Sequence, residues 1–408
     1  MLDSGLAHSG FRTRSVHGGV RPDPTTGALA PAISAAVNYA APYGEIGLSA
    51  AESGATGAFV YSREGHPNGH QLERRLALLE GGDEALVFAS GMAAISALCL
   101  QLLDEGDHAV VGDVSYAGSA ELLRSLLPAK GIAVSVVDLS APDEVRAAMR
   151  PETRFVFGET PCNPTTKLFD VSAGAEVARA AGAVFAVDST FATPVVTQPL
   201  ALGADLVVHS LSKFIGGHGD ALGGAVVGNA ELVGRLRNDL SIRLGGVLSP
   251  FDAWLLLRGS ETLDLRVRAA CDAAAQIADH LEGHPYVTRV LYPGLRSHPQ
   301  FSLAQRQMRL PGAVLAFAVR DAAAFGAALM ERGRLVTYAT SLGLTRTVVL
   351  YCDTTDLQRT TYRFDGRHLE RYRAWAGEGI FRLSPGLEDP PDLVAELDDI
   401  LTLAASRA

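Results

Sequence analysis

The chain of 408 residues has few cysteines and no long hydrophobic runs. No run of about eighteen apolar residues occurs, so no segment is predicted to span a bilayer. Residues 1–15 lack the apolar core of a signal peptide. The four cysteines, at positions 99, 162, 271 and 352, lie far apart without a CxxC pair. This spacing argues against a disulfide framework and a thiolate zinc site, and we expect a cytoplasmic protein.

Positive charge is scarcer than negative charge. The 35 lysines and arginines face 45 aspartates and glutamates, which gives a net charge of −10. An acidic chain is a poor nucleic-acid binder, because phosphate contacts need clustered cations. Hydrophobic residues make up 48% and charged residues 20% of the chain, which is typical of globular proteins and argues against wholesale disorder.

Lysine is rare even among the cations, since only Lys130, Lys167 and Lys213 occur. Arginine supplies the positive charge elsewhere. A retained lysine can form an imine with a carbonyl group, which arginine cannot do. We interpret Lys130 and Lys167 as ordinary solvent-facing charges that survived a bias towards arginine.

The middle of the chain alternates short apolar runs with segments of helical period. Beyond residue 70, ALVFAS, HAVVGD, AVSVVDL, RFVFGET, AVFAVDS and ADLVVHS have the form of strands, and most are separated by helical segments. This alternation predicts βαβ units and an α/β fold with a mostly parallel sheet. We expect an N-terminal arm over residues 1–60, a large domain over 61–258 and a smaller α+β domain over 259–408.

The first candidate site follows the strand ALVFA. Ser90, Gly91 and Met92 come where this strand ends and a helix is predicted to begin. A serine N-cap followed by glycine leaves free backbone N–H groups at the positive end of a helix, which favours a phosphate there. Ordinary helix capping explains the same residues, so the motif is weak alone.

Two later strands end in polar residues of a different kind. AVFAV leads into Asp188, and DLVVH leads into Ser210, Leu211, Ser212 and Lys213. The carboxyl ends of parallel strands meet at one edge of a sheet, where ligands of open α/β sheets bind. A carboxylate for a pyridinium nitrogen, a lysine for an imine and hydroxyls for a phosphate are what pyridoxal 5'-phosphate (PLP) requires.

Other cofactors are disfavoured. His209 and His218 have no second ligand at helical spacing, so we expect no metal site. The glycine-rich stretch GGHGDALGG does not match the GxGxxG fingerprint after a strand, which argues against a nicotinamide dehydrogenase.

Three long segments carry a family resemblance. YSREGHPNGHQLERRLALLEGGDEALVFASGMAAISA, GETPCNPTTKLFD and AVDSTFATPVVTQPLALGADLVVHSLSKFIGGHGDALGG resemble the Cys/Met-metabolism family of PLP enzymes. These are fold-type I enzymes such as cystathionine γ-synthase, cystathionine γ-lyase and methionine γ-lyase. The resemblance extends over residues 13–405 and implies a fold-type I PLP-dependent transferase architecture.

The resemblance implies a role for each residue that could hold the cofactor. Lys213 resembles the lysine bonded to PLP, Asp188 the carboxylate on the pyridine nitrogen, and Tyr116 the tyrosine stacked on the ring. The positions that match the phosphate cradle are Gly91, Met92, Ser210 and Ser212. For catalysis we expect the freed Lys213 amine to move protons and Tyr116 to act as an acid.

Other matches concern the substrate and a second subunit. Asn163 resembles the asparagine near the phenolic oxygen of the cofactor. Ser341 and Arg382 resemble the groups that seat the α-carboxylate of the substrate, for which arginine offers two parallel hydrogen bonds. Tyr61 and Arg63 resemble a pair that a neighbouring subunit contributes to the phosphate. The resemblance thus implies a homotetramer built as a dimer of dimers.

The sequence also departs from the family pattern. Segment 342–381 replaces a common family stretch and is a few residues longer, so the specificity for the substrate side chain stays open. Gly118 stands where methionine γ-lyases place a cysteine, and Thr340 where some cystathionine enzymes have glutamate. Arg243 stands where relatives are uncharged. It either meets an anionic substrate group or lies on a surface.

The activity implied by the resemblance is elimination or replacement at the γ-carbon of a sulfur-containing or O-acylated amino acid. Two alternatives stay open: a β-lyase of cystathionine or cysteine conjugates, and a biosynthetic enzyme that joins an unusual nucleophile to a vinylglycine-type intermediate. A catalytically dead binding protein is disfavoured, because Lys213 and Asp188 are intact. We expect an amino-acid substrate and no nucleic-acid or membrane partner.

Overall fold

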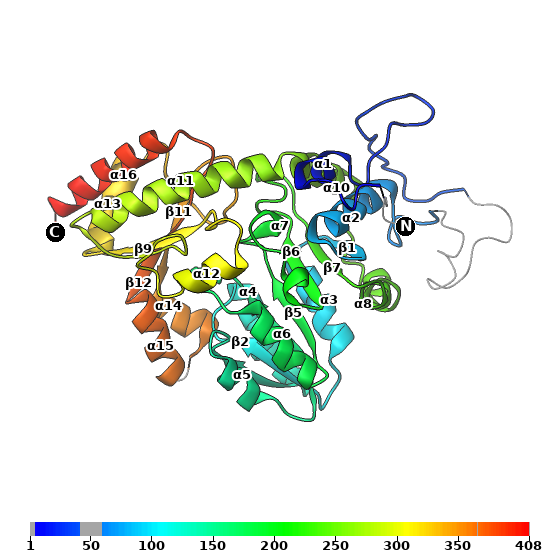
Figure 1. Ribbon diagram of the computed structural model, residues 1–408, viewed down its shortest axis with the longest axis horizontal. Helices are drawn as coiled ribbons and strands as arrows, with labels where there is room; N and C mark the ends of the chain where they lie inside the picture. Colours follow the sequence, from blue (N-terminus) through cyan, green and yellow to red (C-terminus); the bar gives the residue numbers. More distant parts are fainter. Residues whose placement is uncertain (1–4, 41–58, 365, 408) are drawn as a thin grey trace.

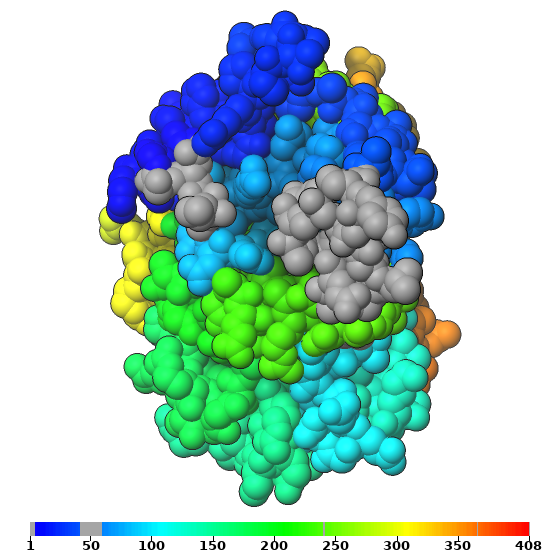
Figure 2. Space-filling view, turned by 90° about the vertical axis from the view of Figure 1, so that its right-hand side faces the viewer, coloured from blue at the N-terminus to red at the C-terminus, as the bar shows by residue number. Residues whose placement is uncertain are grey.

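The computed structural model describes residues 5–40, 59–364 and 366–407. Of the expected N-terminal arm, residues 1–4 and 41–58 lie outside the described residues. The described part contains one short helix, α1 (Phe11–His17), which packs against α2 (Pro67–Glu80) and α10 (Pro250–Glu261). Figure 2 shows this part, in dark blue, across one end of the molecule.

A seven-stranded sheet forms the larger part of the molecule (Figure 1). Its strands are β1 (Glu84–Phe88), β2 (His108–Gly112), β3 (Ala133–Val137), β4 (Thr153–Glu159), β5 (Val184–Asp188), β6 (Leu206–Ser210) and β7 (Gly224–Gly228), in the order β1-β7-β6-β5-β4-β2-β3. Only β7 runs antiparallel to its neighbours. The expected mostly parallel α/β sheet is therefore confirmed.

Helices cover both faces of this sheet. They are α3 (Gly91–Leu102), α4 (Ala117–Glu121), α5 (Pro142–Ala148), α6 (Val171–Ala180), α7 (Thr193–Val196), α8 (Ala230–Arg235) and α9 (Ile242–Leu244), with single turns at Leu122–Leu126, Pro128–Lys130, Pro199–Leu202 and Leu236–Ser241. Alternate strand residues enter opposite cores: Ala85 and Val87 pack towards α2 and α10, whereas Leu86 and Phe88 pack towards α3. This two-sided burial explains why the strands are short continuous apolar runs.

A five-stranded sheet follows in the C-terminal part. Its strands are β8 (Val287–Leu291), β9 (Leu315–Val319), β10 (Thr337–Tyr338), β11 (Val348–Asp353) and β12 (Gly379–Ser384), in the order β10-β11-β12-β9-β8. The accompanying helices are α11 (Leu263–Gly283), α12 (Phe301–Gln307), α13 (Ala322–Arg332), α14 (Thr354–Leu357), a turn at Gln358–Tyr362, α15 (Gly366–Ala376) and α16 (Pro390–Ala405). Among the described residues, no helix is long and apolar enough to cross a membrane.

A mixed apolar cluster joins the two sheets. Val114 and Cys162, from loops that follow strands of the large sheet, pack with Tyr362, Tyr372 and Ile380 of the C-terminal part. The loops beyond β2 and β4 therefore touch segment 342–381, at the same edge of the sheet where the sequence places the site residues.

Candidate active site

One cavity of about 460 Å³ lies where the carboxyl ends of β4, β5 and β6 face the second sheet. Its volume falls within the range of about 300–1,000 Å³ that is usual for small-molecule sites. The cavity brings together most of the expected site residues: Gly91, Met92, Tyr116, Asn163, Asp188, Ser210, Ser212, Lys213, Ser341 and Arg382. Residues that lie between positions 91 and 382 of the sequence thus line one space.

One end of the cavity has features that favour binding of an anion. The hydroxyl of Ser90 caps α3 by accepting a hydrogen bond from the N–H of Ala93 at 3.1 Å. A Cβ on Gly91 would lie 3.0 Å from the Cβ of Ser210, so glycine lets the start of the helix approach that serine. The N-terminus of α3 and the Ser210 and Ser212 side chains therefore share one end of the cavity, where a phosphate is favoured.

Lys213 lines the same cavity. Its Nζ donates a hydrogen bond to the Ser341 hydroxyl at 2.9 Å. Burial lowers the pKa of the Lys213 amine, and the positive charge of Arg382 lowers it further. Both effects favour the neutral amine, which is the form that attacks carbonyl groups and accepts protons.

Two buried carboxylates form the floor. Asp188 of β5 lies beside Glu159 of β4 in the register of the sheet. Burial raises the pKa of Asp188, although the N–H and hydroxyl of Thr190 donate hydrogen bonds to its Oδ1 at 3.0 and 2.6 Å. The pKa of Glu159 is raised well above its usual value by burial and then by the charge of Asp188. A cation that binds Asp188 would relieve this repulsion.

Glu159 also orders two functional loops. Its carboxylate accepts hydrogen bonds from the backbone N–H of Tyr116 and from that of Asn163, each at 2.7 Å. The hydroxyl of Tyr362 donates to the carbonyl oxygen of Ser115 at 2.6 Å and lies 3.3 Å from that of Asn163. Glu159 and Tyr362 thus both contact the loop before Tyr116 and the loop at Asn163.

The sequence analysis did not single out either of these two residues. The signal for Glu159 was present, because it is the polar residue that ends the strand RFVFGE inside a quoted motif. Tyr362 had no such signal, since it lies in segment 342–381, where the chain departs from the family.

Arg382 is buried and points into the cavity. Its Nη1 donates to Oδ1 of Asn163 at 2.8 Å, and its Nη2 donates to the carbonyl oxygen of Ser341 at 2.7 Å. Its Nε has no hydrogen-bond partner among the described residues. The guanidinium therefore has donor capacity to offer a ligand carboxylate.

Three residues with expected roles do not line this cavity. Tyr61 is 42% exposed, and the Arg63 guanidinium lies over its ring, 5.5 Å from the centroid. Arg63 also donates to the carbonyl oxygen of Ile242 at 3.1 Å. The side chain of Arg243 is 63% exposed and donates to the carbonyl oxygen of Asp239. Thr340 does line the cavity.

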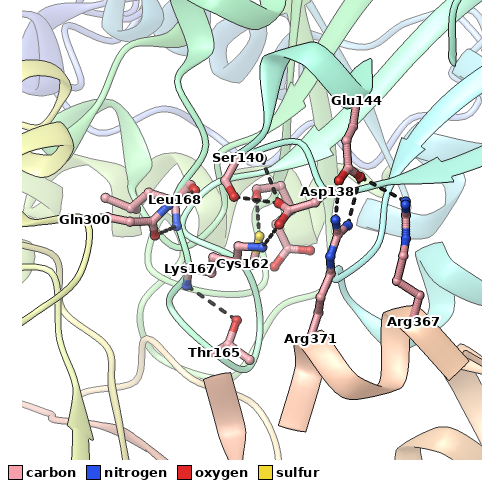
Figure 3. A network of polar contacts seen from close by, with 11 residues as sticks. Asp138, Ser140, Glu144, Cys162, Thr165, Lys167, Leu168, Gln300, Arg367 and Arg371 are labelled. Atoms are coloured by element: carbon pink, nitrogen blue, oxygen red, sulfur yellow. Dashed lines mark hydrogen bonds and ion pairs between the residues drawn. The ribbon is translucent and has the colours of Figure 1, made fainter. Parts of the chain in front are cut away.

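The other two lysines lie elsewhere. Lys130 is exposed at the end of a short turn. Lys167 forms an ion pair with Asp138 at 2.6 Å, and its Nζ lies 5.8 Å from the centre of the Trp375 ring. Figure 3 shows this network beside Glu144 and the two arginines of α15 that bind it. The Lys167 side chain is therefore largely buried in an ion pair, and the prediction that it faces solvent is wrong.

The two histidines considered as metal ligands have other partners. Nε2 of His209 is paired with the carboxylate of Glu80, and both side chains are buried. Nδ1 of His218 lies 2.7 Å from the carbonyl oxygen of Gly216. The described residues contain no group of three or more candidate metal ligands.

Comparison with known proteins agrees with this geometry. Residues 12–402 match the model of a family described as Cys/Met metabolism PLP-dependent enzyme. The chain belongs to this family. It is similar to a canavanine gamma-lyase of Rhizobium leguminosarum bv. trifolii, with 41% identity over 398 residues that cover 96% of each chain. An L-methionine gamma-lyase of Porphyromonas gingivalis is 39% identical over 97% of this chain and 98% of its own.

Solved structures show the same fold. A cystathionine gamma-lyase from Lactobacillus plantarum complexed with L-serine superposes with a TM-score of 0.86 at 34% sequence identity. The match covers 97% of this chain and 99% of that one. The expected family and the fold-type I architecture are therefore confirmed, and the chain is a PLP-dependent enzyme.

The cavity of this family member fits PLP chemically. The close approach that Gly91 permits leaves a cradle for the phosphate between α3 and β6. The described hydrogen bonds to the Asp188 carboxylate both come from Thr190 and both go to Oδ1, so Oδ2 can accept one from a pyridinium N–H. The Lys213 amine, favoured in its neutral form, lies in the same cavity.

Proposed function

We propose that this enzyme catalyses γ-elimination or γ-replacement on a sulfur-containing or O-acylated amino acid. One observation carries the proposal: a single cavity holds Lys213, whose pKa is lowered by burial, together with Asp188, Arg382 and Tyr116. The names of the similar proteins, which are gamma-lyases, support the same class of reaction.

Arg382 and Ser341 orient the substrate in this proposal. The free Nε of Arg382 and its two Nη groups suit the α-carboxylate, and Asn163 fixes the guanidinium from the other side. PLP, when bound, supplies an electron sink for negative charge at the α-carbon. Asp188 keeps the pyridine nitrogen protonated through its charge.

Lys213 and Tyr116 move the protons. Removal of a proton from Cα and then from Cβ must precede departure of a γ-substituent, and one amine can serve both adjacent atoms. The Lys213 amine suits this role because burial lowers its pKa. Tyr116 is nearly half exposed in the cavity, so its hydroxyl can donate a proton to the leaving group.

A product panel tests the proposed reaction. O-Acetylhomoserine, methionine and cystathionine should yield 2-oxobutyrate or a γ-replacement product faster than any cysteine derivative yields pyruvate. Pyruvate as the dominant product would instead make the enzyme a β-lyase. Borohydride reduction followed by peptide mapping should place the cofactor on Lys213, and an adduct on Lys130 or Lys167 would contradict the assignment.

We also propose a cytoplasmic homotetramer built as a dimer of dimers. Tyr61 and Arg63 do not line their own cavity, which supports a role at the phosphate of a neighbouring subunit. The unpaired state of all four cysteines is consistent with a reducing compartment.

A further inference from the structure

Arg266 of α11 contacts the turn that carries Lys213. Its Nη1 donates a hydrogen bond to the carbonyl oxygen of Phe214 at 2.7 Å, and its Nη2 donates to that of Ile215 at 3.2 Å. These two residues directly follow Lys213 in the chain. The Arg266 side chain thus ties the backbone beside the lysine to a helix of 21 residues that continues into the C-terminal part of the molecule (Figure 1).

Each nitrogen of this guanidinium has a hydrogen-bond acceptor. Nη2 also donates to the carbonyl oxygen of Gly259 at 2.6 Å, and Nε donates to the Thr262 hydroxyl at 3.0 Å. Arg266 is 8% exposed, and burial lowers its pKa to about 10. These four acceptors are all uncharged, and a buried ion is often no more stabilising than an apolar side chain of similar size. Packing alone therefore does not explain an arginine here.

The turn after Lys213 is closely packed. Gly217 has a φ of +74°, and its N–H donates to the carbonyl oxygen of Lys213 at 2.7 Å. A Cβ on Gly217 would lie 1.8 Å from Nη1 of Arg266, and a Cβ on Gly343 would lie 2.5 Å from the backbone nitrogen of Phe214. The turn is therefore in close contact with both Arg266 and the segment around Gly343, which limits its movement.

The amine end of Lys213 is held separately. Its Nζ donates to the Ser341 hydroxyl at 2.9 Å, and the carbonyl oxygen of Ser341 accepts from Arg382 at 2.7 Å. The contacts of Arg266 restrain the backbone end of the lysine, and the contact with Ser341 restrains its amine end. A reacting group that is fixed in this way has a high effective concentration towards its partner, because little freedom of movement is left to lose.

We infer that Arg266 is a positioning residue, which holds the turn after Lys213 so that the lysine amine stays in place to bond to the cofactor and to accept protons from the substrate. The inference rests on the role proposed above for Lys213. Loss of the arginine should have an effect that general damage to the site would not have. Lys213 should compete less well for the cofactor, so an incoming amino acid should displace it more readily.

Displacement of Lys213 by 2-aminoisobutyrate tests this competition in the holoenzyme. This amino acid has no proton at Cα, so only the exchange of amines occurs. Its amine forms the carbon–nitrogen double bond to the cofactor that Lys213 gives up, and its two protons pass to the lysine nitrogen. Borohydride reduction at each concentration, followed by mass spectrometry, gives the fraction of cofactor still bonded to Lys213.

The expected change is a lower apparent Kd for 2-aminoisobutyrate. Arg266→Gln should lower this Kd by about 10-fold relative to the unchanged enzyme, because the lysine that competes with the ligand is no longer held in place. Damage to the ligand site would raise the Kd instead. An equal or higher Kd in Arg266→Gln would overturn the inference.

The number of donors predicts the order of two variants. Arg266 serves four acceptors, whereas a lysine has three N–H donors on a single nitrogen and a glutamine amide has two. Arg266→Lys should therefore lower the Kd for 2-aminoisobutyrate by only about 3-fold. If the glutamine variant does not fold, the lysine variant decides the question, and an unchanged Kd in that variant would overturn the inference.

Turnover provides an independent readout. With O-acetylhomoserine, kcat of Arg266→Gln should fall by at least about 10-fold while KM should not rise, because the freed lysine amine is out of place when it accepts the proton at Cα. An unchanged kcat, or a loss of activity through KM alone, would contradict the positioning role.

Arg75→Gln is the matched control. Arg75 of α2 is 0% exposed, and burial lowers its pKa to about 10 as well. Its side chain donates to four groups outside the Lys213 turn: the carbonyl oxygens of Val16, Gly18 and Leu257 and the hydroxyl of Ser260. Both glutamine variants should lower the thermal unfolding midpoint, because each leaves buried acceptors without donors. Only the Arg266 variant should change the Kd for 2-aminoisobutyrate, and equal changes in both would refute the inference.

Failure of the proposed function would look different from failure of this inference. If γ-substituted amino acids yield neither 2-oxobutyrate nor a replacement product while the Kd for 2-aminoisobutyrate still falls in Arg266→Gln, the proposed γ-chemistry is wrong and the positioning role stands. If the γ-products form normally and the Kd is unchanged in Arg266→Gln, the positioning role alone is refuted.

Discussion

The substitution Tyr362→Phe removes one hydroxyl group and keeps the aromatic ring. It should therefore show whether this hydroxyl positions the loop before Tyr116, without disturbing the packing of the protein core. Tyr362 is 2% exposed, and its hydroxyl donates to the carbonyl oxygen of Ser115 at 2.6 Å. Burial raises the pKa of Tyr362 well above its usual value, so the hydroxyl stays protonated and remains a donor. Phenylalanine keeps the ring that stacks on Phe364 with a centroid distance of 4.8 Å.

The size of the effect follows from the group left without a partner. A buried carbonyl that loses its donor costs about 1–3 kcal/mol. If the whole penalty falls on the transition state, kcat would drop by about 5- to 150-fold. We expect a decrease of about 10-fold in kcat for γ-elimination and a smaller change in KM, because the shorter contact of the hydroxyl is with Ser115, which precedes Tyr116, whereas its contact with the carbonyl oxygen of Asn163, beside Arg382, is longer at 3.3 Å.

Tyr372→Phe is the matched control. Tyr372 is 3% exposed and lies 5.9 Å from the Tyr362 ring, but its hydroxyl has no hydrogen-bond partner among the described residues. Its removal should leave kcat unchanged and should not lower the thermal unfolding midpoint. Steady-state kinetics and thermal unfolding of both variants provide the comparison. If the two variants are equally active, the Tyr362 hydroxyl does not position the loop.

Three further variants probe the site. Tyr116→Phe should lower γ-activity by about 10²- to 10⁴-fold, the usual contribution of an acid, and β-elimination should suffer less in a pyruvate assay. Mixed and refolded Arg63→Ala and Lys213→Ala chains should regain activity through one intact shared site, and inactive hybrids would exclude sharing. Gly118→Ala should lower kcat by about 10- to 100-fold, because its Cβ would displace the Tyr116 ring. Gly326→Ala on α13 is the control: its Cβ meets open space, so the free energy of unfolding should rise by about 0.5–1 kcal/mol.

The parallel part of the fold could be predicted because its strands are buried on both faces. Such strands appear as continuous apolar runs between helical segments, as in β1, β2, β4, β5 and β6, whereas β3 at the edge of the sheet is mostly half-buried. β7, with the sequence GAVVG, was missed because its glycines resemble a loop. Those glycines are needed in the structure, since a Cβ on Gly224 would lie 2.2 Å from the carbonyl oxygen of Ser90.

The second sheet was less predictable. In the stretch RLVTYATS only the two residues of β10 form a strand, and neither β8 nor β11 was among the predicted strands. β8 has two adjacent exposed positions, Thr288 and Arg289, and only its last residue is buried, so its sequence VTRVL carries little hydrophobic signal. The stretch from Pro250 has one continuous helical pattern, yet it forms two helices, α10 and α11, that meet at Thr262.

Some residues of the site could be predicted from the local sequence, and others could not. Residues at strand ends could be found because parallel strands bring their carboxyl ends to one edge. Tyr362 could not, since the residue that it holds, Ser115, lies 247 positions away. No periodicity or spacing connects two such positions, and only the packing of segment 342–381 against the β2 loop brings them together.

The sequence and the structure suggest different reasons for a glycine at position 118. In the sequence, the glycine is notable because it lacks the thiol that methionine γ-lyases carry there. In the structure, a Cβ at this position would lie 2.9 Å from Cε1 of Tyr116 and 3.0 Å from Sδ of Met92, so glycine makes room for the tyrosine ring. If space is the decisive property, Gly118→Ala and Gly118→Cys should lose γ-activity together. If the thiol is decisive, only the cysteine variant should gain methionine elimination, and the alanine variant should behave as the unchanged enzyme does.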